Sequence, residues 1–458
     1  MIVTRRSFMK RAAAMAAGLA ASGDVPFNLA AMAAASTLRA SPVSDYKALV
    51  CVFLFGGNDG NNTVIPYGAS DHAVYASGRG SLAIGRDELA ATRIAPTNTG
   101  GREFALHPSM TRLATVFGNG KAAVIANVGP LVQPITKQQW DQSSVPVPPN
   151  LFSHSDQQSQ WQIGTVDSAV RTGWGGRLVD VFYSQNATAI ASCISTAGRS
   201  TFLGGQSATG FSISPNGRFG FDFYESDAST DPVSVGFREI LTTARAHLFE
   251  QAFVDTLKGS IETQRLFDQA INDAPALATA FPQTGLGDQL STVARMIAAR
   301  AALGVKRQAF FVTLGGFDTH GGDQPQQQAG LLEEVSEAIG AFYDASIEMG
   351  VANQVTTFTQ SDFCRDYPAN GNGGSDHGWG NHHLVVGGAV AGKKLYGTFP
   401  TLAVNGPDDS GGGRWIPTTS VDQYSATMAR WFGVTASDLP LVAPNIGRFA
   451  SADLGFLG

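Results

Sequence analysis

The chain has 458 residues, of which 43% are hydrophobic and 15% charged, and its net charge at pH 7 is −6. This composition allows a large buried core and excludes general disorder. No basic patch follows the N-terminal arginines, so the sequence predicts no nucleic-acid partner. At about 100–200 residues per domain, the length allows two domains or one large α/β domain.

The N-terminal segment is typical of a twin-arginine export signal. Arg5 and Arg6 precede an apolar stretch rich in small residues at 12–21, and A-x-A cleavage sites follow at 31–33 and 33–35. Polar residues interrupt the stretch, which is too short to span about 30 Å of hydrocarbon. We expect residues 1–35 to be a signal read by the twin-arginine translocase. The mature chain is then periplasmic or extracellular, without a stable membrane span.

The elements expected from apolar patterning alternate between strands and helices. Continuous apolar runs predict buried strands at residues 48–55, 122–128, 308–314, 354–359 and 383–387. Helical spacing of apolar residues predicts helices at residues 286–303, 326–349 and 420–433. Buried strands separated by helices favour an α/β fold, with a mostly parallel central sheet between helices.

One domain is expected over residues 45–458. Within it, residues 184–236 are rich in Ser, Gly and Thr and weakly periodic. We expect this segment to be an inserted loop or a small cap.

The three cysteines do not form a metal knuckle or a redox motif. Cys51 lies in the first apolar run, where a buried free thiol is expected. No C-x-x-C pair or haem spacing is present, which disfavours a redox protein. The sequence leaves open whether any two of Cys51, Cys193 and Cys364 form a disulfide.

Acidic residues and histidines gather at the ends of the predicted strands. Asp59 follows the first strand, Asp318 and His320 follow the strand at 308–314, Asp362 follows the next, and His377 precedes the last. Ligands of open α/β sheets bind beyond the carboxyl ends of the strands. Carboxylate and imidazole suit zinc, manganese or iron, which activate water or a hydroxyl group. The pattern predicts a divalent metal site, although Gly-Gly-Asn-Asp-Gly alone is also an ordinary turn.

These segments resemble a family of bacterial proteins called domain of unknown function 1501, many of which carry a twin-arginine signal. The matching stretches are FLFGGNDG at 53–60, LHP at 106–108, GGFDTH at 315–320, SDF at 361–363, SDHG at 375–378 and RWFG at 430–433. Sequence similarity places this family in the alkaline phosphatase-like superfamily, with sulfatases and phosphomutases. The resemblance implies a parallel-rich sheet between helices, with one or two metals at the strand ends.

The resemblance also implies roles for single residues. Asp59 resembles the first-strand metal aspartate, and Asp318, His320 and His377 resemble the ligands of one metal. Asp362 resembles the aspartate of the second metal. Zinc or manganese is the implied ion.

The nucleophile implied by the resemblance is Ser153, with Ser155 or a loop threonine as alternatives. The neighbouring Ser153-His154 pair is by itself a weak signal, because Ser-His pairs are common by chance. Arg365 is expected either to bind a substrate anion or to pair with Asp366.

The sequence departs from the superfamily after Asp362. Phe363 stands where the phosphatases usually have a second histidine, so a second-metal ligand is missing or comes from elsewhere, such as His382 or His383. No Cys-x-Pro-x-Arg or Ser-x-Pro-x-Arg occurs, which disfavours a formylglycine sulfatase.

Two functions follow from these expectations. The first is a metal-dependent hydrolase of phosphate or sulfate esters, acting on an anionic small molecule or polymer. The alternative is a non-catalytic exported binding or scaffold protein on the same fold, which the missing histidine favours.

Overall fold

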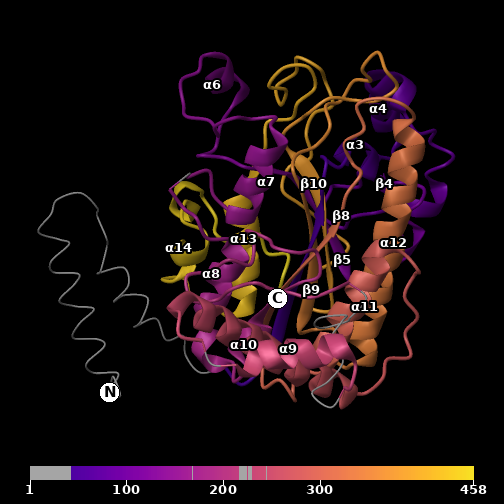
Figure 1. Cartoon of the computed structure of the whole chain (residues 1–458). Helices are drawn as coiled ribbons and strands as arrows, with labels where there is room; N and C mark the ends of the chain where they lie inside the picture. The colour runs from indigo at the N-terminus through magenta and orange to yellow at the C-terminus, as the bar shows by residue number, and fades with distance from the viewer. Residues whose placement is uncertain (1–42, 168, 216–223, 225–228, 244) are drawn as a thin grey trace, which may run out of the picture. The chain divides into compact units, whose positions relative to one another are not determined.

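The centre of the computed structural model is a mostly parallel β-sheet between helices (Figure 1). The structure describes residues 43–167, 169–215, 224, 229–243 and 245–458, and the predicted signal at 1–35 lies outside this part. Across the sheet, the strands are β11 (Leu395–Tyr396), β5 (Ala122–Gly129), β10 (Asn381–Gly387), β9 (Val355–Ser361), β1 (Lys47–Leu54), β8 (Arg307–Leu314), β6 (Cys193–Ser195) and β7 (Phe211–Ser212), and β12 (Thr419–Ser420) also pairs with β5. The expected α/β fold class is confirmed.

β1 lies inside the sheet because its side chains are apolar on both faces. Its residues from Ala48 to Leu54 are all buried, as in strands covered by helices on both sides. β1 pairs in parallel with β8 and with β9, and Leu54 lies opposite both Leu314 and Ser361. The carboxyl ends of these three strands therefore meet at one edge of the sheet.

β10 runs against its neighbours. It is antiparallel to β9 and to β5, and its first residue, Asn381, lies opposite Val128 near the end of β5. The segment before β10, rather than the one after it, therefore reaches the edge where β1, β8 and β9 end.

Helices cover both faces of the sheet (Figure 1). One layer holds α5 (Thr111–Gly118), α11 (Gly285–Ala298) and α12 (Gln324–Glu348), and the other holds α7 (His154–Ile163), α8 (Trp174–Asp180) and α13 (Val421–Phe432). Ser420 and Gln423 form a capping box at the start of α13, and Gly433 ends it in the left-handed conformation. These caps explain why the predicted helix at 420–433 has the observed bounds.

The segment at 184–236, expected to be an insertion, adds two strands to the sheet. β6 pairs in parallel with β8, and β7 pairs with β6. Cys193 and Ile194 are buried, so β6 continues the apolar core rather than a solvated cap. Residues 216–223 and 225–228 of this segment lie outside the described part.

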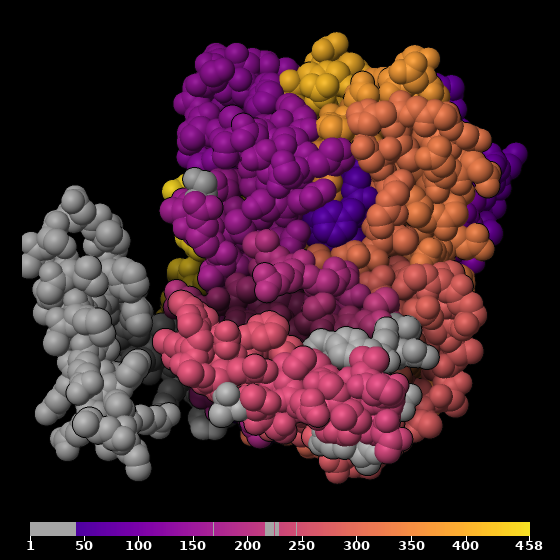
Figure 2. Space-filling model, in the orientation of Figure 1, coloured from indigo at the N-terminus to yellow at the C-terminus, as the bar shows by residue number. Residues whose placement is uncertain are grey.

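The remaining elements surround this core. They are α3 (Gly60–Thr63), α4 (Ala69–Arg79), α6 (Lys137–Asp141), α9 (Pro232–Thr242), α10 (Leu248–Asn272), α14 (Leu439–Val442) and a small sheet of β2 (Val64–Pro66), β4 (Phe104–Leu106) and β3 (Arg93–Ile94). Figure 2 shows a hollow on one face, between the purple residues around 100–200 and the orange residues around 300–360. In the described part of the chain, no helix combines the length and apolarity needed to cross a bilayer.

Candidate metal centre

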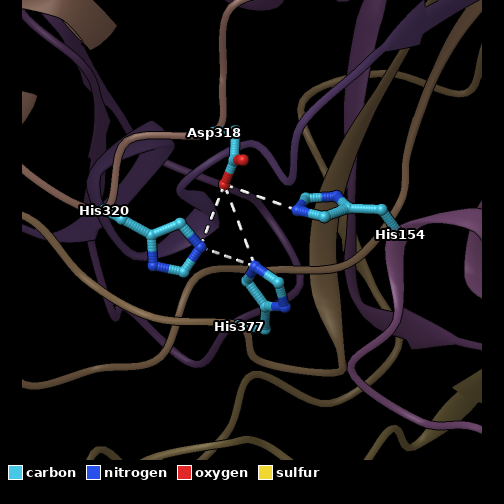
Figure 3. Close-up of side chains that lie close together, drawn as sticks. All are labelled: His154, Asp318, His320 and His377. Atoms are coloured by element: carbon cyan, nitrogen blue, oxygen red, sulfur yellow. Dashed lines mark hydrogen bonds and ion pairs between the residues drawn. The ribbon is translucent and has the colours of Figure 1, made fainter.

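Four side chains from three separate segments converge at the edge where β1, β8 and β9 end (Figure 3). His154 is the first residue of α7, Asp318 and His320 follow β8, and His377 precedes β10. One ligand atom from each residue lies within 4.8 Å of those of the other three. The sheet topology therefore gathers residues that are more than 200 positions apart in the sequence.

The spacing of these atoms fits a small cation. Asp318 Oδ1 lies 3.1 Å from His320 Nε2, 3.4 Å from His154 Nε2 and 3.8 Å from His377 Nε2. The Nε2 atoms of His320 and His377 are 2.7 Å apart. Tetrahedral ligands at about 2.0–2.2 Å from zinc are separated by roughly 3.3 Å, so the observed separations, from 2.7 Å to at most 4.8 Å, lie on both sides of the value for a zinc site.

Two of the histidines are oriented by carboxylates. His154 Nδ1 lies 2.6 Å from Asp362 Oδ2, and His320 Nδ1 lies 2.9 Å from Asp376 Oδ1. A carboxylate accepts hydrogen bonds, so each Nδ1 carries a proton and each Nε2 is left to present a lone pair. Carboxylate–histidine pairs of this kind hold metal-binding imidazoles in the required orientation.

The third histidine is oriented by a backbone carbonyl. His377 Nδ1 donates to the carbonyl oxygen of Phe152 at 2.6 Å. Phe152 has a φ angle of 70°, which is rare for a bulky residue and typical of functional sites. With both Nδ1 atoms protonated, His320 and His377 face each other through lone pairs, and His154 Nε2 is buried without a hydrogen-bond partner. A divalent cation would satisfy the Nε2 atoms of His154 and His377, and at His320 it would replace the long 3.4 Å contact between Nε2 and Arg365 Nη1.

Charges around the centre favour ligand forms that bind metal. Burial raises the pKa of Asp318, but the hydrogen bond and charge of Arg365 outweigh it and bring the pKa below its ordinary value. Burial lowers the pKa of His377, and the nearby cations lower it further. The hydrogen bond that His154 donates to the Asp362 carboxylate raises the pKa of His154, so metal binding there displaces a proton.

The centre is open to solvent. The side chains of Asp318 and His320 are 51% and 44% exposed, and those of His154 and His377 are 28% and 24% exposed. Structural zinc sites are closed, whereas catalytic ones leave a position for water or substrate. The arrangement can therefore bring a small anion or a water molecule to a bound ion.

Arg365 contacts the centre from below the surface. Its buried guanidinium forms an ion pair with Asp318 and donates to the carbonyl oxygens of Phe317 and Ser375. The sequence left two partners open for Arg365, a substrate anion or Asp366, and the structure places it on Asp318 instead. Asp318 holds this position because β8 and β9, which precede the two residues, are separated in the sheet only by β1.

Asp59, predicted as a first-strand metal ligand, lies outside the group of four. Its side chain is fully buried and forms an ion pair with the equally buried Arg79. Gln324 Nε2 and the backbone nitrogen of Asn61 also donate to it, at 2.8 and 3.1 Å. The carboxylate is thus satisfied by protein groups.

Asp362, predicted for a second metal, is buried behind His154. It accepts from His154 Nδ1, from Gln158 Nε2 at 2.7 Å and from the backbone nitrogen of Gly56 at 3.2 Å. The structure brings it next to the centre, but as a hydrogen-bond partner of one ligand.

His382 and His383, considered as replacements for a missing ligand, point elsewhere. His382 accepts from the backbone nitrogen of Asn127 and stacks on Phe399, and His383 packs against Trp161. Burial lowers the pKa of each to about 3, as expected of neutral core histidines.

Ser153 precedes His154 at the start of α7. Its hydroxyl donates to Asp156 at 2.6 Å and lies 3.3 Å from the hydroxyl of Ser155. His154 itself was not predicted as a ligand. The available signal was that His154 lies two residues before an acidic residue, Asp156, but the sequence did not show that α7 brings His154 to Asp318.

Comparisons with known proteins place the chain in a family. The sequence model of the family described as "Protein of unknown function (DUF1501)" matches residues 46–434, so the chain belongs to this family. No curated protein matches the chain.

Several solved structures resemble the chain weakly. Ps i-CgsB in complex with k-i-k-neocarrahexaose has 9% identity and a TM-score of 0.32, covering 87% of this chain and 74% of that one. A Bacteroides thetaiotaomicron structure described for the metabolism of multiple glycosaminoglycans has 10% identity and a TM-score of 0.32, covering 86% and 74%. A mutant of alkaline phosphatase PafA has 12% identity and a TM-score of 0.24, covering 71% and 64%. At such TM-scores the likeness carries no argument about activity.

Proposed function

We propose that this member of the DUF1501 family is an exported, metal-dependent hydrolase of phosphate or sulfate esters. The observation that carries the proposal is the convergence of three histidine Nε2 atoms and one carboxylate at an exposed sheet edge. The residues that would hold the ion are His154, Asp318, His320 and His377. Nitrogen and oxygen ligands of this kind suit zinc or manganese.

One ion per chain is the expected content. A second metal in the superfamily would use the carboxylates of Asp59 and Asp362, but Arg79 already neutralises the first and His154 engages the second. A buried guanidinium supplies the positive charge that a second ion would otherwise bring. We therefore propose a centre with a single divalent ion.

The chemistry follows from the ion and from the residues around it. When bound, such an ion polarises an ester oxygen and lowers the pKa of bound water to about 7. Ser153 is the proposed nucleophile, because it adjoins His154 and its hydroxyl donates to the Asp156 carboxylate. That hydrogen bond makes the largest contribution to lowering the pKa of Asp156. A carboxylate with a lowered pKa is a weak base, so the proposed role of Asp156 is to orient the Ser153 hydroxyl rather than to remove its proton.

Export is proposed from the N-terminal sequence. Arg5 and Arg6, the apolar stretch and the small residues that follow support transport by the twin-arginine translocase to the periplasm or beyond. This route carries folded proteins, so a metal can be bound before export.

The alternative function is a non-catalytic binding or scaffold protein. The ion pair between Arg79 and Asp59 favours it, because it removes a carboxylate that the two-metal phosphatases need. The ion pair between Arg365 and Asp318 also favours it, because the guanidinium neutralises the Asp318 carboxylate without a metal.

Metal content separates these functions. We would purify the mature chain, residues 36–458, and measure bound metal by elemental analysis in the wild type and in His154→Ala, Asp318→Ala and His377→Ala. His247→Ala, at an exposed histidine before α10, is the matched control. One zinc or manganese per chain, lost in the three variants and kept in the control, supports the hydrolase and justifies a screen of phosphate and sulfate esters. Wild type without metal after incubation with each ion refutes it.

A further inference from the structure

Arg414 contacts Phe152, a neighbour of the metal centre. Its guanidinium stands over the ring of Phe152, 4.8 Å from the ring centroid. The carbonyl oxygen of the same Phe152 accepts the hydrogen bond that orients His377. Through this one residue, in its unusual left-handed conformation, the position of the guanidinium is tied to that of a proposed metal ligand.

A rigid loop presents this arginine. The buried Asp409 carboxylate accepts from the backbone nitrogens of Gly411, Gly413 and Arg414, at 2.8, 2.9 and 2.9 Å. Gly411 and Gly413 have φ angles of 125° and 81°, which residues with a Cβ rarely adopt. The tight loop therefore holds the backbone of Arg414 in one place before any ligand binds.

The guanidinium has donors to spare. Within the described residues its nitrogens make no hydrogen bond or ion pair, and its Nε is buried without a partner. Burial raises the pKa of the Asp366 carboxyl, and the charge of Arg414 lies near enough to that group to oppose the rise. The other arginines near the centre differ: Arg79 and Arg365 are each paired with a carboxylate and with carbonyl oxygens. A partly desolvated cation without acceptors is unfavourable unless an anion satisfies it.

We propose that Arg414 binds the anionic oxygens of the phosphate or sulfate group of the substrate. The proposal rests on the proposed function and names the residue that selects its substrate class. The N–H groups of a guanidinium form a planar fork that matches two oxygens of a tetrahedral oxyanion. With the ion on one side and Arg414 on the other, the centre would hold an oxyanion at two points.

Binding of inorganic phosphate and sulfate to the full chain tests the proposal. Metal-loaded wild type, Arg414→Gln and Arg414→Lys would be titrated with each anion by calorimetry, and the metal content of each variant measured in parallel. Charge-assisted hydrogen bonds contribute enough that Arg414→Gln should bind the preferred anion about tenfold to hundredfold more weakly, with unchanged metal content. Arg414→Lys keeps the charge but not the fork, so its affinity should lie between the two.

Arg86→Gln is the matched control. Arg86 also stacks on an aromatic ring, that of Tyr67 at 4.6 Å, but outside the metal centre, and its substitution should leave anion affinity unchanged. Equal affinity in wild type and Arg414→Gln would overturn the inference about Arg414, as would a wild type that binds neither anion. A wild type without metal would instead refute the proposed function, and the loss of anion binding in Arg414→Gln would still support the role of Arg414.

Discussion

Replacing Asp362 by asparagine distinguishes a residue that positions His154 from a ligand of a second metal. Asp362 is fully buried and accepts three hydrogen bonds, from His154, Gln158 and Gly56. An asparagine of the same shape offers one acceptor oxygen and one donor nitrogen. Oδ2 accepts from His154 and Gln158 and Oδ1 accepts from Gly56, so the NH₂ group of asparagine faces either the first two donors or the backbone nitrogen of Gly56. In both orientations the negative charge is lost.

The size of the effect follows from the role. Loss of a residue that orients a metal-binding histidine weakens metal affinity about 10- to 100-fold, or about 1.4–2.8 kcal/mol. The effect of Asp362→Asn lies above the lower end of this range, because the position is fully buried and no water can replace the lost negative charge, even where the asparagine oxygen keeps the 2.6 Å contact to His154. The equivalent change at Asp376, whose side chain is 51% exposed and lies 2.9 Å from His320, belongs at the lower end, since water can replace the lost acceptor.

The assay is competition for the metal against a chelator of known affinity, together with elemental analysis at saturating metal. We expect one ion per chain in wild type, Asp362→Asn and Asp376→Asn. The metal affinity should fall in both variants, and more in Asp362→Asn than in Asp376→Asn. Two ions in the wild type and one in Asp362→Asn would refute the reasoning, because Asp362 would then be a ligand of a second metal. Unchanged affinity would show that the negative charge of Asp362 does not support metal binding by His154.

Three further predictions test the parts around the centre. Asp59→Asn leaves the buried Arg79 without its charge partner, so the free energy of unfolding, measured in urea, should fall by about 3–5 kcal/mol. The metal content should stay unchanged. Loss of metal at full stability would contradict the role of Arg79. Burial raises the pKa of Asp422 to about 7 in the folded chain from 3.8, so the folded state holds this proton more tightly and the contribution of Asp422 to stability falls as pH rises between these values. Asp422→Asn should therefore raise Tm at about pH 8 more than at about pH 5, and an equal change at both would count against it. Substitution of both Arg5 and Arg6 by lysine should keep the protein in the cytoplasm by cell fractionation, and continued export would refute the signal.

The strands were predictable because their signal is local and redundant. The run at 122–128 coincides with β5, and the run at 48–55 lies within one residue of β1, since buried parallel strands are apolar at every position. The short strands β6 and β7 were not predicted. A strand of two or three residues holds too few side chains to show a period, and β6 belongs to the sheet only because β8 provides its partner.

The candidate centre was predictable only in part, for a similar reason. Asp318, His320 and His377 stand directly beside strands, so the position of each strand end places them at one edge. His154 starts a helix after a long loop, and nothing in the local sequence says which strand end that helix reaches. Phe152 supplies the missing constraint through its left-handed backbone, and a left-handed phenylalanine has no sequence signature.

The three aspartates that follow strands show how exposure and charged partners decide whether a carboxylate can bind a metal. In the sequence, Asp59, Asp318 and Asp362 are equivalent, since each follows a predicted strand and lies in a polar loop. In the structure they differ in the group that shares their charge: Arg79 for Asp59, His154 for Asp362, and both Arg365 and the open centre for Asp318. Asp318 and Asp59 each pair with a guanidinium, which keeps its proton at neutral pH, so the type of partner does not separate them. Exposure does: the side chains of Asp59 and Asp362 are fully buried, whereas that of Asp318 is 51% exposed and can reach a bound ion, which reduces three potential ligands to one.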